Sequence, residues 1–420
     1  MNPLRFCIAF VLACTLTAVF SKAANHDWPQ WRGPLRTGHA MAGSRVPEHL
    51  PDQPKVIWRI KSGEGHSGLI VASGRLIYTG AEGEIEVVYV LDANTGKELW
   101  KQPYAQLYRD EWGAGPRATP ISDIDRLYIQ SCRGDFCCFQ LADGKLIWKT
   151  NFEKDFGVKF LGSKANEGTA SRRGNNGTSI VDGNAVIVPV GATNGASLVC
   201  FDKLEGKVLR KCGEDEAAYS SLMVATLGGV KQVLHFNAEA LVGVDRETGR
   251  LLWRVPLKTN AKRHAATPVI IGDHVLVNSH TFGVICFNIA KERGEWKATE
   301  SWHNNDLKIN LATPVVVGDY IYSHGANKDF LCVGARSGEL KWSREGFGEQ
   351  YSSTIAIADK LLVLADTGQL VLIAADPSAY RELGRTQVCG KTWSFPAFAG
   401  GKLFVRDARQ LTCFDLLNPQ

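Results

Sequence analysis

The chain has 420 residues and carries 48 basic and 43 acidic side chains, which gives a formal net charge of +5. A charge so close to balance provides no basic surface for nucleic acid, so nucleic-acid binding is not expected. Beyond the N-terminal signal described next, no apolar run approaches the roughly 20 residues that a membrane-spanning helix needs. We therefore expect no transmembrane segment after signal removal.

Residues 1–24 have the pattern of a secretory signal peptide. Arg5 supplies a positive charge, Phe6 to Phe20 form an apolar stretch, and Ser21 to Ala24 offer small residues for cleavage. We therefore expect an exported protein, located in the periplasm or outside the cell. An alternative is a lipoprotein signal in which Cys14 carries the lipid.

Residues 25–53 are predicted to form an extended arm that packs on the rest of the protein. The stretch from Asp27 to Pro34 consists mostly of Trp, Pro and Gly, which do not favour a regular element. Trp28 and Trp31 could alternatively stack on carbohydrate. After the arm, Val56 to Ile60 reads as a β-strand.

A segment from Leu91 to Trp100 is repeated along the chain, and in each other copy the Trp lies eight residues after the first residue, as Trp100 does after Asp92. Asp202 to Arg210 keeps this spacing but replaces the Trp. The later copies are about 43 to 46 residues apart, the length of one four-stranded propeller blade. The other copies run from Gln140 to Trp148, Asp245 to Trp253, Asn288 to Trp296 and Gly334 to Trp342.

Eight first strands can be counted, which predicts an all-β fold with eight four-stranded antiparallel blades over residues 54–420. The eighth unit ends at Asp415 without a fourth strand, whereas the first is preceded by the spare strand that contains Trp58. We expect this N-terminal strand to pair into the last blade and close the ring, which leaves no unpaired edge between the first and last blades. The domain is expected to be a monomer.

The recurrent Trp residues are predicted to be structural, each docking one blade on the next through its ring and indole NH. This set comprises Trp58, Trp100, Trp148, Trp253, Trp296 and Trp342. Five of the eleven Cys fall at one repeat position, and equivalent positions in neighbouring sheets should lie too far apart for disulfides. They are Cys138, Cys200, Cys286, Cys332 and Cys413.

Two long insertions precede first strands, Gln102 to Arg117 and Phe152 to Gly177, and in a meander they lie on one face of the ring. Long loops on a rigid scaffold commonly carry function. In the second insertion, Arg172, Arg173 and Asn175 form a candidate anion-binding loop. The residues just before each first strand should surround the channel mouth as a ligand site. They are His66, Arg117, Asn176, Tyr219, His264, Asn310, Tyr351 and Trp393.

The pattern of Asp92, Thr95, Gly96, Lys97 and Trp100 resembles the repeats of the pyrroloquinoline-quinone-like (PQQ-like) propellers. That superfamily includes quinoprotein alcohol dehydrogenases and the propeller lipoprotein of the outer-membrane-protein assembly machinery. The leader with Trp28 and Trp31 is similar to that of exported propellers from planctomycete-like bacteria.

This resemblance implies either PQQ with Ca²⁺ as cofactor or a protein-binding role. A Ca²⁺ site would need carboxylate and amide ligands. The candidates for these ligands and for an aromatic floor are Asp110, Glu111, Glu167 and Asn176, with Trp112 or Trp393. None lies in a motif that matches the dehydrogenases, so no metal site is assigned. The resemblance also implies that Cys137 and Cys138 could form a vicinal disulfide.

The sequence favours an exported binding or scaffold protein without catalytic activity, because the repeat framework is complete but no catalytic set is recognisable. Its insertion-bearing face would bind a protein segment, a glycan or a small anionic ligand. A small PQQ- and Ca²⁺-dependent oxidoreductase and an outer-membrane assembly factor, which would bind an envelope protein, are the alternatives.

Overall fold

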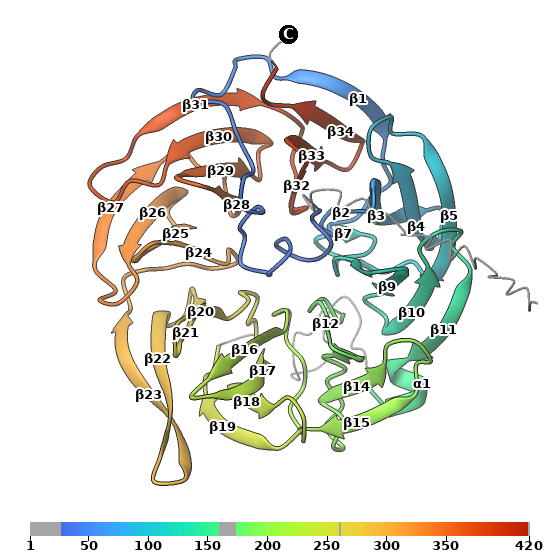
Figure 1. Cartoon of the computed structure of the whole chain (residues 1–420), viewed down its shortest axis with the longest axis vertical. Coiled ribbons are helices and arrows are strands. Elements are labelled where there is room, and N and C mark those ends of the chain that lie inside the picture. The colour runs from blue at the N-terminus through green and yellow to red at the C-terminus, as the bar shows by residue number, and fades with distance from the viewer. Residues whose placement is uncertain (1–26, 159–173, 260–261, 419–420) are drawn as a thin grey trace, which may run out of the picture.

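The computed structural model describes residues 27–158, 174–259 and 262–418. The signal segment with Cys14, and Glu167, Arg172 and Arg173 of the second insertion, lie outside the described residues. Within the described part, the strands form eight four-stranded sheets around a central axis, as Figure 1 shows. The predicted all-β, eight-bladed propeller is confirmed.

Blades are numbered here by their first strands in chain order. Blade one contains β2 (Ile70–Ala72), β3 (Arg75–Glu82), β4 (Ile85–Asp92) and β5 (Glu98–Gln106). Blade two contains β8 (Ile121–Asp123), β9 (Arg126–Gln130), β10 (Asp135–Gln140) and β11 (Leu146–Asn151). Blade three contains β12 (Ile180–Asp182), β13 (Ala185–Val188), β14 (Leu198–Asp202) and β15 (Val208–Cys212). Blade four contains β16 (Met223–Leu227), β17 (Val230–Phe236), β18 (Ala240–Asp245) and β19 (Leu251–Pro256).

Blade five contains β20 (Val269–Ile271), β21 (His274–Ser279), β22 (Gly283–Glu292) and β23 (Glu295–Asn304). Blade six contains β24 (Val315–Val317), β25 (Tyr320–His324), β26 (Asp329–Gly334) and β27 (Leu340–Glu345). Blade seven contains β28 (Ser352–Ile357), β29 (Lys360–Ala365), β30 (Gln369–Ala374) and β31 (Glu382–Gln387). Blade eight contains β32 (Ala397–Ala399), β33 (Lys402–Arg406), β34 (Gln410–Asp415) and β1 (Lys55–Lys61).

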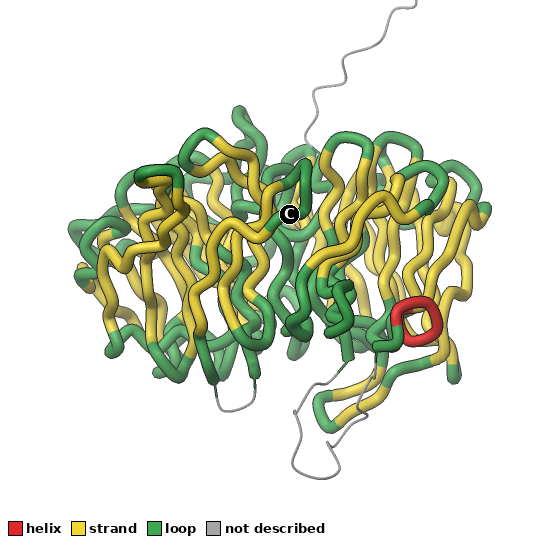
Figure 2. The backbone as a smooth tube through the Cα atoms, turned by 90° about the horizontal axis from the view of Figure 1, so that it is seen from below, coloured by secondary structure: helices red, strands yellow, loops and turns green. Residues whose placement is uncertain are grey.

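The pairing of β1 with β34 closes the ring. The two strands are antiparallel, with Lys55 opposite Asp415 and Trp58 opposite Cys413. The prediction that the N-terminal strand completes the last blade is therefore confirmed. Seen from the side, the strands run between the two faces of the disc (Figure 2).

Only short elements lie outside the blades in the described residues. A two-stranded hairpin of β6 (Arg109–Asp110) and β7 (Gly113–Ala114) forms part of the first insertion. Helix α1 (Phe152–Phe156) begins the second. None of the described helices is long and apolar enough to cross a membrane.

The hydrophobic core lies between the blades. The middle strands are buried on both faces because each blade packs against two neighbours, so their sequences are nearly continuously apolar. In β10, Cys137 packs into the core shared with blade one, whereas Cys138 packs into the core shared with blade three. Both are free thiols on opposite faces of the strand, and burial raises the pKa of each to about 12.

The repeated Asp-to-Gly segment is a tight turn between the third and fourth strands. In blade one, the Asp92 carboxylate accepts hydrogen bonds from the backbone of Asn94 (3.0 Å) and Thr95 (2.9 Å), and Gly96 follows with φ of 71°. A Cβ at Gly96 would lie 2.7 Å from the Trp58 ring of blade eight. Two properties of the position therefore require Gly: its positive φ, and the Trp ring of the preceding blade, which leaves no room for a Cβ.

The docking residues on the outer strands donate to backbone carbonyls of the next blade. The indole NH groups of Trp58, Trp100 and Trp148 donate to Ala93 (3.1 Å), Leu141 (3.0 Å) and Lys203 (3.3 Å) respectively. Trp342 makes the same bond to Asp376 at 2.8 Å. Trp253 differs, because its NH donates to the side chain of Gln232 in its own blade.

The prediction for Trp296 was wrong, because the β22–β23 hairpin is longer than its counterparts. Trp302, not Trp296, lies opposite Cys286, and its indole NH donates to Ala335 of blade six at 3.1 Å. Trp296 lies nearer the tip of the hairpin, where a Cβ added at Gly228 of blade four would lie 3.0 Å from its ring.

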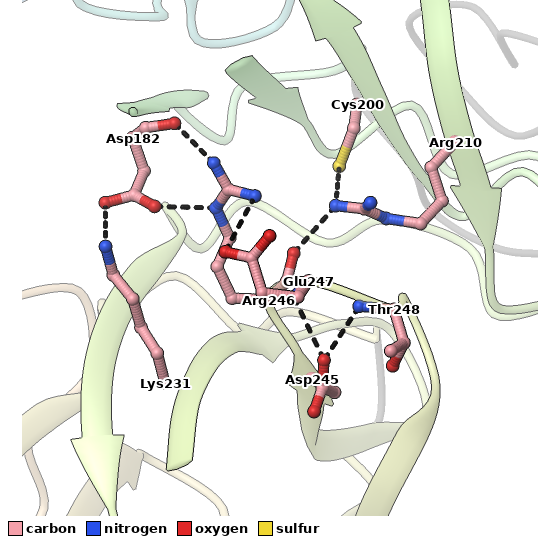
Figure 3. A network of polar contacts seen from close by, with 8 residues as sticks. All are labelled: Asp182, Cys200, Arg210, Lys231, Asp245, Arg246, Glu247 and Thr248. Carbon is pink, nitrogen blue, oxygen red and sulfur yellow. Dashed lines mark hydrogen bonds and ion pairs between the residues drawn. The ribbon is translucent and has the colours of Figure 1, made fainter. Parts of the chain in front are cut away.

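Arg210 takes the docking position in blade three, as Figure 3 shows. Its guanidinium donates to the carbonyl of Arg246 in blade four at 2.7 Å. The Arg246 side chain in turn binds Asp182 of blade three, which also accepts from Lys231 at 2.6 Å. Burial favours a raised pKa for Asp182, but hydrogen bonds from Lys231 and Arg246 hold this pKa below its ordinary value.

Replacement of Arg210 by Ala is expected to destabilise the protein by about 1–3 kcal/mol, because it removes a charge-assisted hydrogen bond and leaves the Arg246 carbonyl without this donor. Urea unfolding at neutral pH measures the change. Arg250→Ala, which removes an exposed Arg from the neighbouring turn, is the control and should change stability by less than about 0.5 kcal/mol. Equal effects would contradict a docking role.

Candidate functional site

The N-terminal arm runs into the middle of the ring (Figure 1). Trp28 pairs with Val71 of blade one through backbone hydrogen bonds of 2.8 and 2.9 Å, and Ala40 donates to Ala356 of blade seven. Trp28 is 1% exposed and stacks on Phe395 of blade eight. Since it is buried in this way, Trp28 cannot stack on carbohydrate, which corrects that alternative.

Trp31 forms part of the floor of a recess at the channel mouth, with a volume of about 180 Å³. Its indole NH donates to Thr267 Oγ1 at 3.0 Å, and its ring lies against Phe395 at 5.0 Å between centroids. The structure brings six of the eight predicted mouth residues into the lining of this recess. They are His66, Arg117, Asn176, Tyr219, Tyr351 and Trp393.

The other two predicted mouth residues do not line the recess. In blade five the lining residue is Ala265, and in blade six it is Leu311, each one position after the predicted residue. His264 is fully buried and stacks on Phe236 with ring centroids 4.0 Å apart. The placements of His264 and Asn310 in the lining were therefore wrong, and this sector of the mouth is apolar.

A larger recess of about 470 Å³ adjoins the first, and His66 and Trp393 line both. The Trp393 ring lies 5.6 Å from the ring of His66 and 5.6 Å from that of Trp112, measured between centroids. Trp112 comes from the first insertion and is 40% exposed. Together Trp112 and Trp393 form what we call the aromatic shelf. Glu64, Glu111 and Gln350 also line this recess.

Arg117 is held by an ion pair in the wall of the mouth. It binds Asp110, whose side chain is fully buried, and lies over the ring of Tyr108 at 5.3 Å from the centroid. The first insertion therefore supplies both the carboxylate and the aromatic ring that position this guanidinium, which remains 13% exposed.

His66 is neutral in the folded protein over the physiological pH range. Burial lowers its pKa to about 4, and the charge of Arg117 contributes in the same direction. Its Nε2 lies 3.1 Å from the Trp112 carbonyl, so the neutral ring donates there and ties the first insertion to blade one.

Acidification should weaken the protein through His66, because the unfolded chain binds a proton near pH 6.5 while the folded chain resists protonation until about pH 4. Above pH 6.5 both the folded and the unfolded chain carry neutral His66, so the free energy of unfolding is unaffected; it decreases as the pH falls from 6.5 toward 4. We expect wild type to lose about 2 kcal/mol more than His66→Gln between pH 7 and pH 4.5. Urea unfolding at both pH values measures the difference; parallel losses in the two proteins would contradict it.

The predicted anion-binding loop is only partly described, and its described member does not face a ligand. Asn175 is fully buried, and its amide donates to the carbonyls of Pro189 (2.8 Å) and Val190 (3.3 Å). Asn175 therefore holds the insertion to blade three, and its assignment to an anion site was wrong.

The donor set for Ca²⁺ does not fit a quinoprotein site within the described residues. Asp110 is committed to Arg117, and residues 27–158, 174–259 and 262–418 contain no group of three or more His, Cys, Asp or Glu side chains that could hold a metal ion. Cys137 and Cys138 are buried in separate cores between blades.

These features define the class of protein as an eight-bladed propeller whose N-terminal arm lies in the middle of the ring and contributes Trp31 to a recess at the channel mouth. Residues 84–309, more than half of the chain, match the family model described as outer membrane protein assembly factor BamB. The chain belongs to this family of PQQ-like propellers.

Solved structures share the fold at low identity. BamB from Moraxella catarrhalis is 13% identical with a TM-score of 0.57, and the match covers 86% of this chain and 97% of that chain. The quinohemoprotein alcohol dehydrogenase ADHIIG from Pseudomonas putida HK5 is 12% identical with a TM-score of 0.57, covering 94% and 81%. The computationally designed Ika8 protein is 11% identical with a TM-score of 0.57, covering 87% and 99%. No curated protein matches the chain.

Proposed function

We propose that the protein is an exported, monomeric binding protein that holds its ligand in the recess at the channel mouth. The observation that supports this most is the recess at the channel mouth, to which the arm contributes Trp31, held there by its hydrogen bond to Thr267. Concave sites lined by aromatic groups and a few convergent polar groups are typical ligand sites. The signal pattern of residues 1–24 supports export to the periplasm or cell exterior.

Binding can be tested with arrays of envelope oligosaccharides and peptides, probed with wild type and with the double variant Trp112→Ala/Trp393→Ala. We expect wild type to retain specific spots and the double variant to lose them. Trp296→Ala removes an aromatic ring from the outer hairpin and should bind as wild type does. Equal retention by wild type and the double variant, or no retention by wild type, would reject the aromatic shelf as the binding surface.

A second candidate function, an outer-membrane assembly factor that binds an envelope protein, is supported by the family match and by exposed apolar side chains on adjacent outer strands. Leu146 and Ile147 of blade two and Val208 and Leu209 of blade three are 36–49% exposed. Such exposed apolar groups favour a protein partner. Outer-membrane proteins that copurify with wild type, but not with Ile147→Lys/Leu209→Lys, would support this function; unchanged copurification would reject this surface.

PQQ with Ca²⁺ is not expected to bind. The Asp110 carboxylate would have to leave Arg117 to become a ligand, which would leave a largely buried guanidinium unpaired. Calorimetric titration with PQQ and Ca²⁺, together with a dye-linked alcohol oxidation assay, checks this prediction. Saturable binding with dye reduction would contradict it and establish an oxidoreductase.

A further inference from the structure

The described part of the channel contains two buried arginines without an acidic partner. Arg32 and Arg36 of the arm are 2% and 1% exposed. Arg36 donates to the carbonyls of Ser179 (2.8 Å) and Thr178 (3.3 Å), and Arg32 donates to that of Pro314 (2.6 Å). Carbonyl groups satisfy hydrogen bonds but carry no net charge, so both positive charges remain uncompensated.

Both arginines lie directly beside the mouth recess. Arg36 binds the carbonyl of Thr178, which lines the recess, and Arg32 interacts electrostatically with Tyr351, which also lines it. Trp31, which lines the recess, belongs to the same arm. Burial lowers the pKa of Arg36 to about 9, with a contribution from Arg32, and that of Arg32 to about 10, so both stay charged at neutral pH.

An anion in the recess would supply the missing countercharge. Burial of a charge without a partner costs several kcal/mol, and the interaction between opposite charges is stronger in a partly desolvated recess than in water. Arg117 adds a third guanidinium on the wall, with Asp110 balancing its charge. The field at the floor is therefore positive, and the recess favours a group such as a carboxylate.

The adjoining recess has the opposite character. The aromatic shelf of Trp112 and Trp393 presents apolar ring surface, and Trp112 is 40% exposed. Glu64, Glu111 and Asp407 line this recess, against Lys391 in the lining and the buried Arg406 that donates to the Gly65 carbonyl, so acidic groups outnumber basic ones and disfavour an anion there. The Glu oxygens and the Gln350 amide can bind hydroxyl groups. A ligand that spans both recesses would therefore place a hydroxylated ring on the shelf and its charged group in the mouth.

We propose that the ligand is an acidic oligosaccharide, with a uronate carboxylate in the mouth recess above Arg32 and Arg36 and a neighbouring sugar ring on the aromatic shelf. This inference rests on the proposed binding function and adds the chemical class of the ligand. The buried arginine charges select the carboxylate, and the shelf selects the ring.

Calorimetric titration of the mature protein tests the proposal with a disaccharide of one galacturonate and one neutral galactose, its methyl ester and the neutral disaccharide of the same linkage. The uronate should bind at least tenfold more tightly than the ester, and its affinity should fall with added salt. Free sulfate distinguishes a general anion site: competition by sulfate as strong as by uronate would overturn the proposal for a saccharide.

Two variants separate the contributions of ring and charge. Trp112→Ala should weaken uronate and ester by the same factor, because both stack on the shelf. Arg36→Met should bring uronate affinity down to that of the ester; circular dichroism and thermal melting must first show that this variant folds. Should it not fold, the comparison of uronate with ester in wild type decides. Equal wild-type affinity for uronate and ester would overturn the proposed ligand and leave the binding function standing, whereas absence of any array ligand would reject that function itself.

Discussion

Deletion of residues 54–60 is expected to abolish cooperative folding. The deletion removes nearly all of β1, so β34 loses its outer partner and blade eight is left with three strands. It also removes Trp58, whose indole NH binds Ala93 and joins blade eight to blade one. The ring would then be open at one joint, with exposed strand edges and apolar surface that favour aggregation. Soluble yield and differential scanning calorimetry measure the outcome.

If the deletion variant does not fold, a single substitution still gives a measurable change in the free energy of unfolding. Trp58→Ala should cost about 3–5 kcal/mol, because it empties a buried aromatic site and removes the link to Ala93. Trp112→Ala, which removes a partly exposed Trp, is the matched control and should be nearly neutral. A deletion variant that stays soluble and keeps the wild-type melting temperature would refute closure of the ring by β1.

Gly206→Ala should destabilise the protein by about 2–5 kcal/mol. Gly206 has φ of 72°, and a Cβ there would lie 2.5 Å from the Trp148 ring of blade two. The change therefore combines a left-handed conformation, costing roughly 1–2 kcal/mol for Ala, with overpacking that costs roughly 1–3 kcal/mol. The free energy of unfolding in urea measures the sum.

Gly74→Ala separates the two contributions. Gly74 has the same φ of 72°, but a Cβ there would meet no atom within 4 Å. We expect the control to show only the conformational cost. If the two substitutions destabilise equally, the Trp148 contact does not constrain this turn, and the dual role assigned to the repeat glycine is wrong.

The fold was predictable because most blades repeat the same turn sequence between the third and fourth strands. Asp92, Gly96 and Trp100 carry a turn, a positive φ and a contact to the next blade, so one segment reports both local structure and packing. Closure by β1 followed from a count of strands, since the last unit lacked one and the first had one to spare. Periodicity is a strong signal when every unit must pack against copies of itself.

Spacing alone failed where a hairpin is longer. Trp296 keeps the usual distance from Cys286, but β22 and β23 extend further and bring Trp302 opposite that Cys instead. The distance to the following blade contained the correct signal, because Trp302 precedes Thr313 by as many residues as Trp342 precedes Ser353.

The residues that line the mouth were predicted correctly in six blades, and in blades five and six the prediction missed by one residue. In the other blades that carry a hydroxyl residue at the start of the first strand, the lining residue lies two positions before it, as Arg117 does before Thr119. The same count gives Ala265 and Leu311 rather than His264 and Asn310.

The floor of the site was not predictable, because no repeat encodes it. Trp31, Arg32 and Arg36 come from a segment without periodicity, and their positions depend on contacts with distant blades. The Trp-, Pro- and Gly-rich composition of the leader indicated packing on the ring but not where. Tertiary contacts of this kind leave little trace in local sequence.

Closure through β1 also sets the order in which the protein can be completed. Among the strands of the ring, β1 is synthesised first and its partner β34 last, so Lys55 can pair with Asp415 only after all the other blade strands have been made. Contacts of such sequence separation slow folding, because the closure entropy is paid before the contact forms. Until then β1 has no strand to pair with, and a chain with seven complete blades is still an open ring. Completion of the protein is therefore a late, single event that joins its two ends.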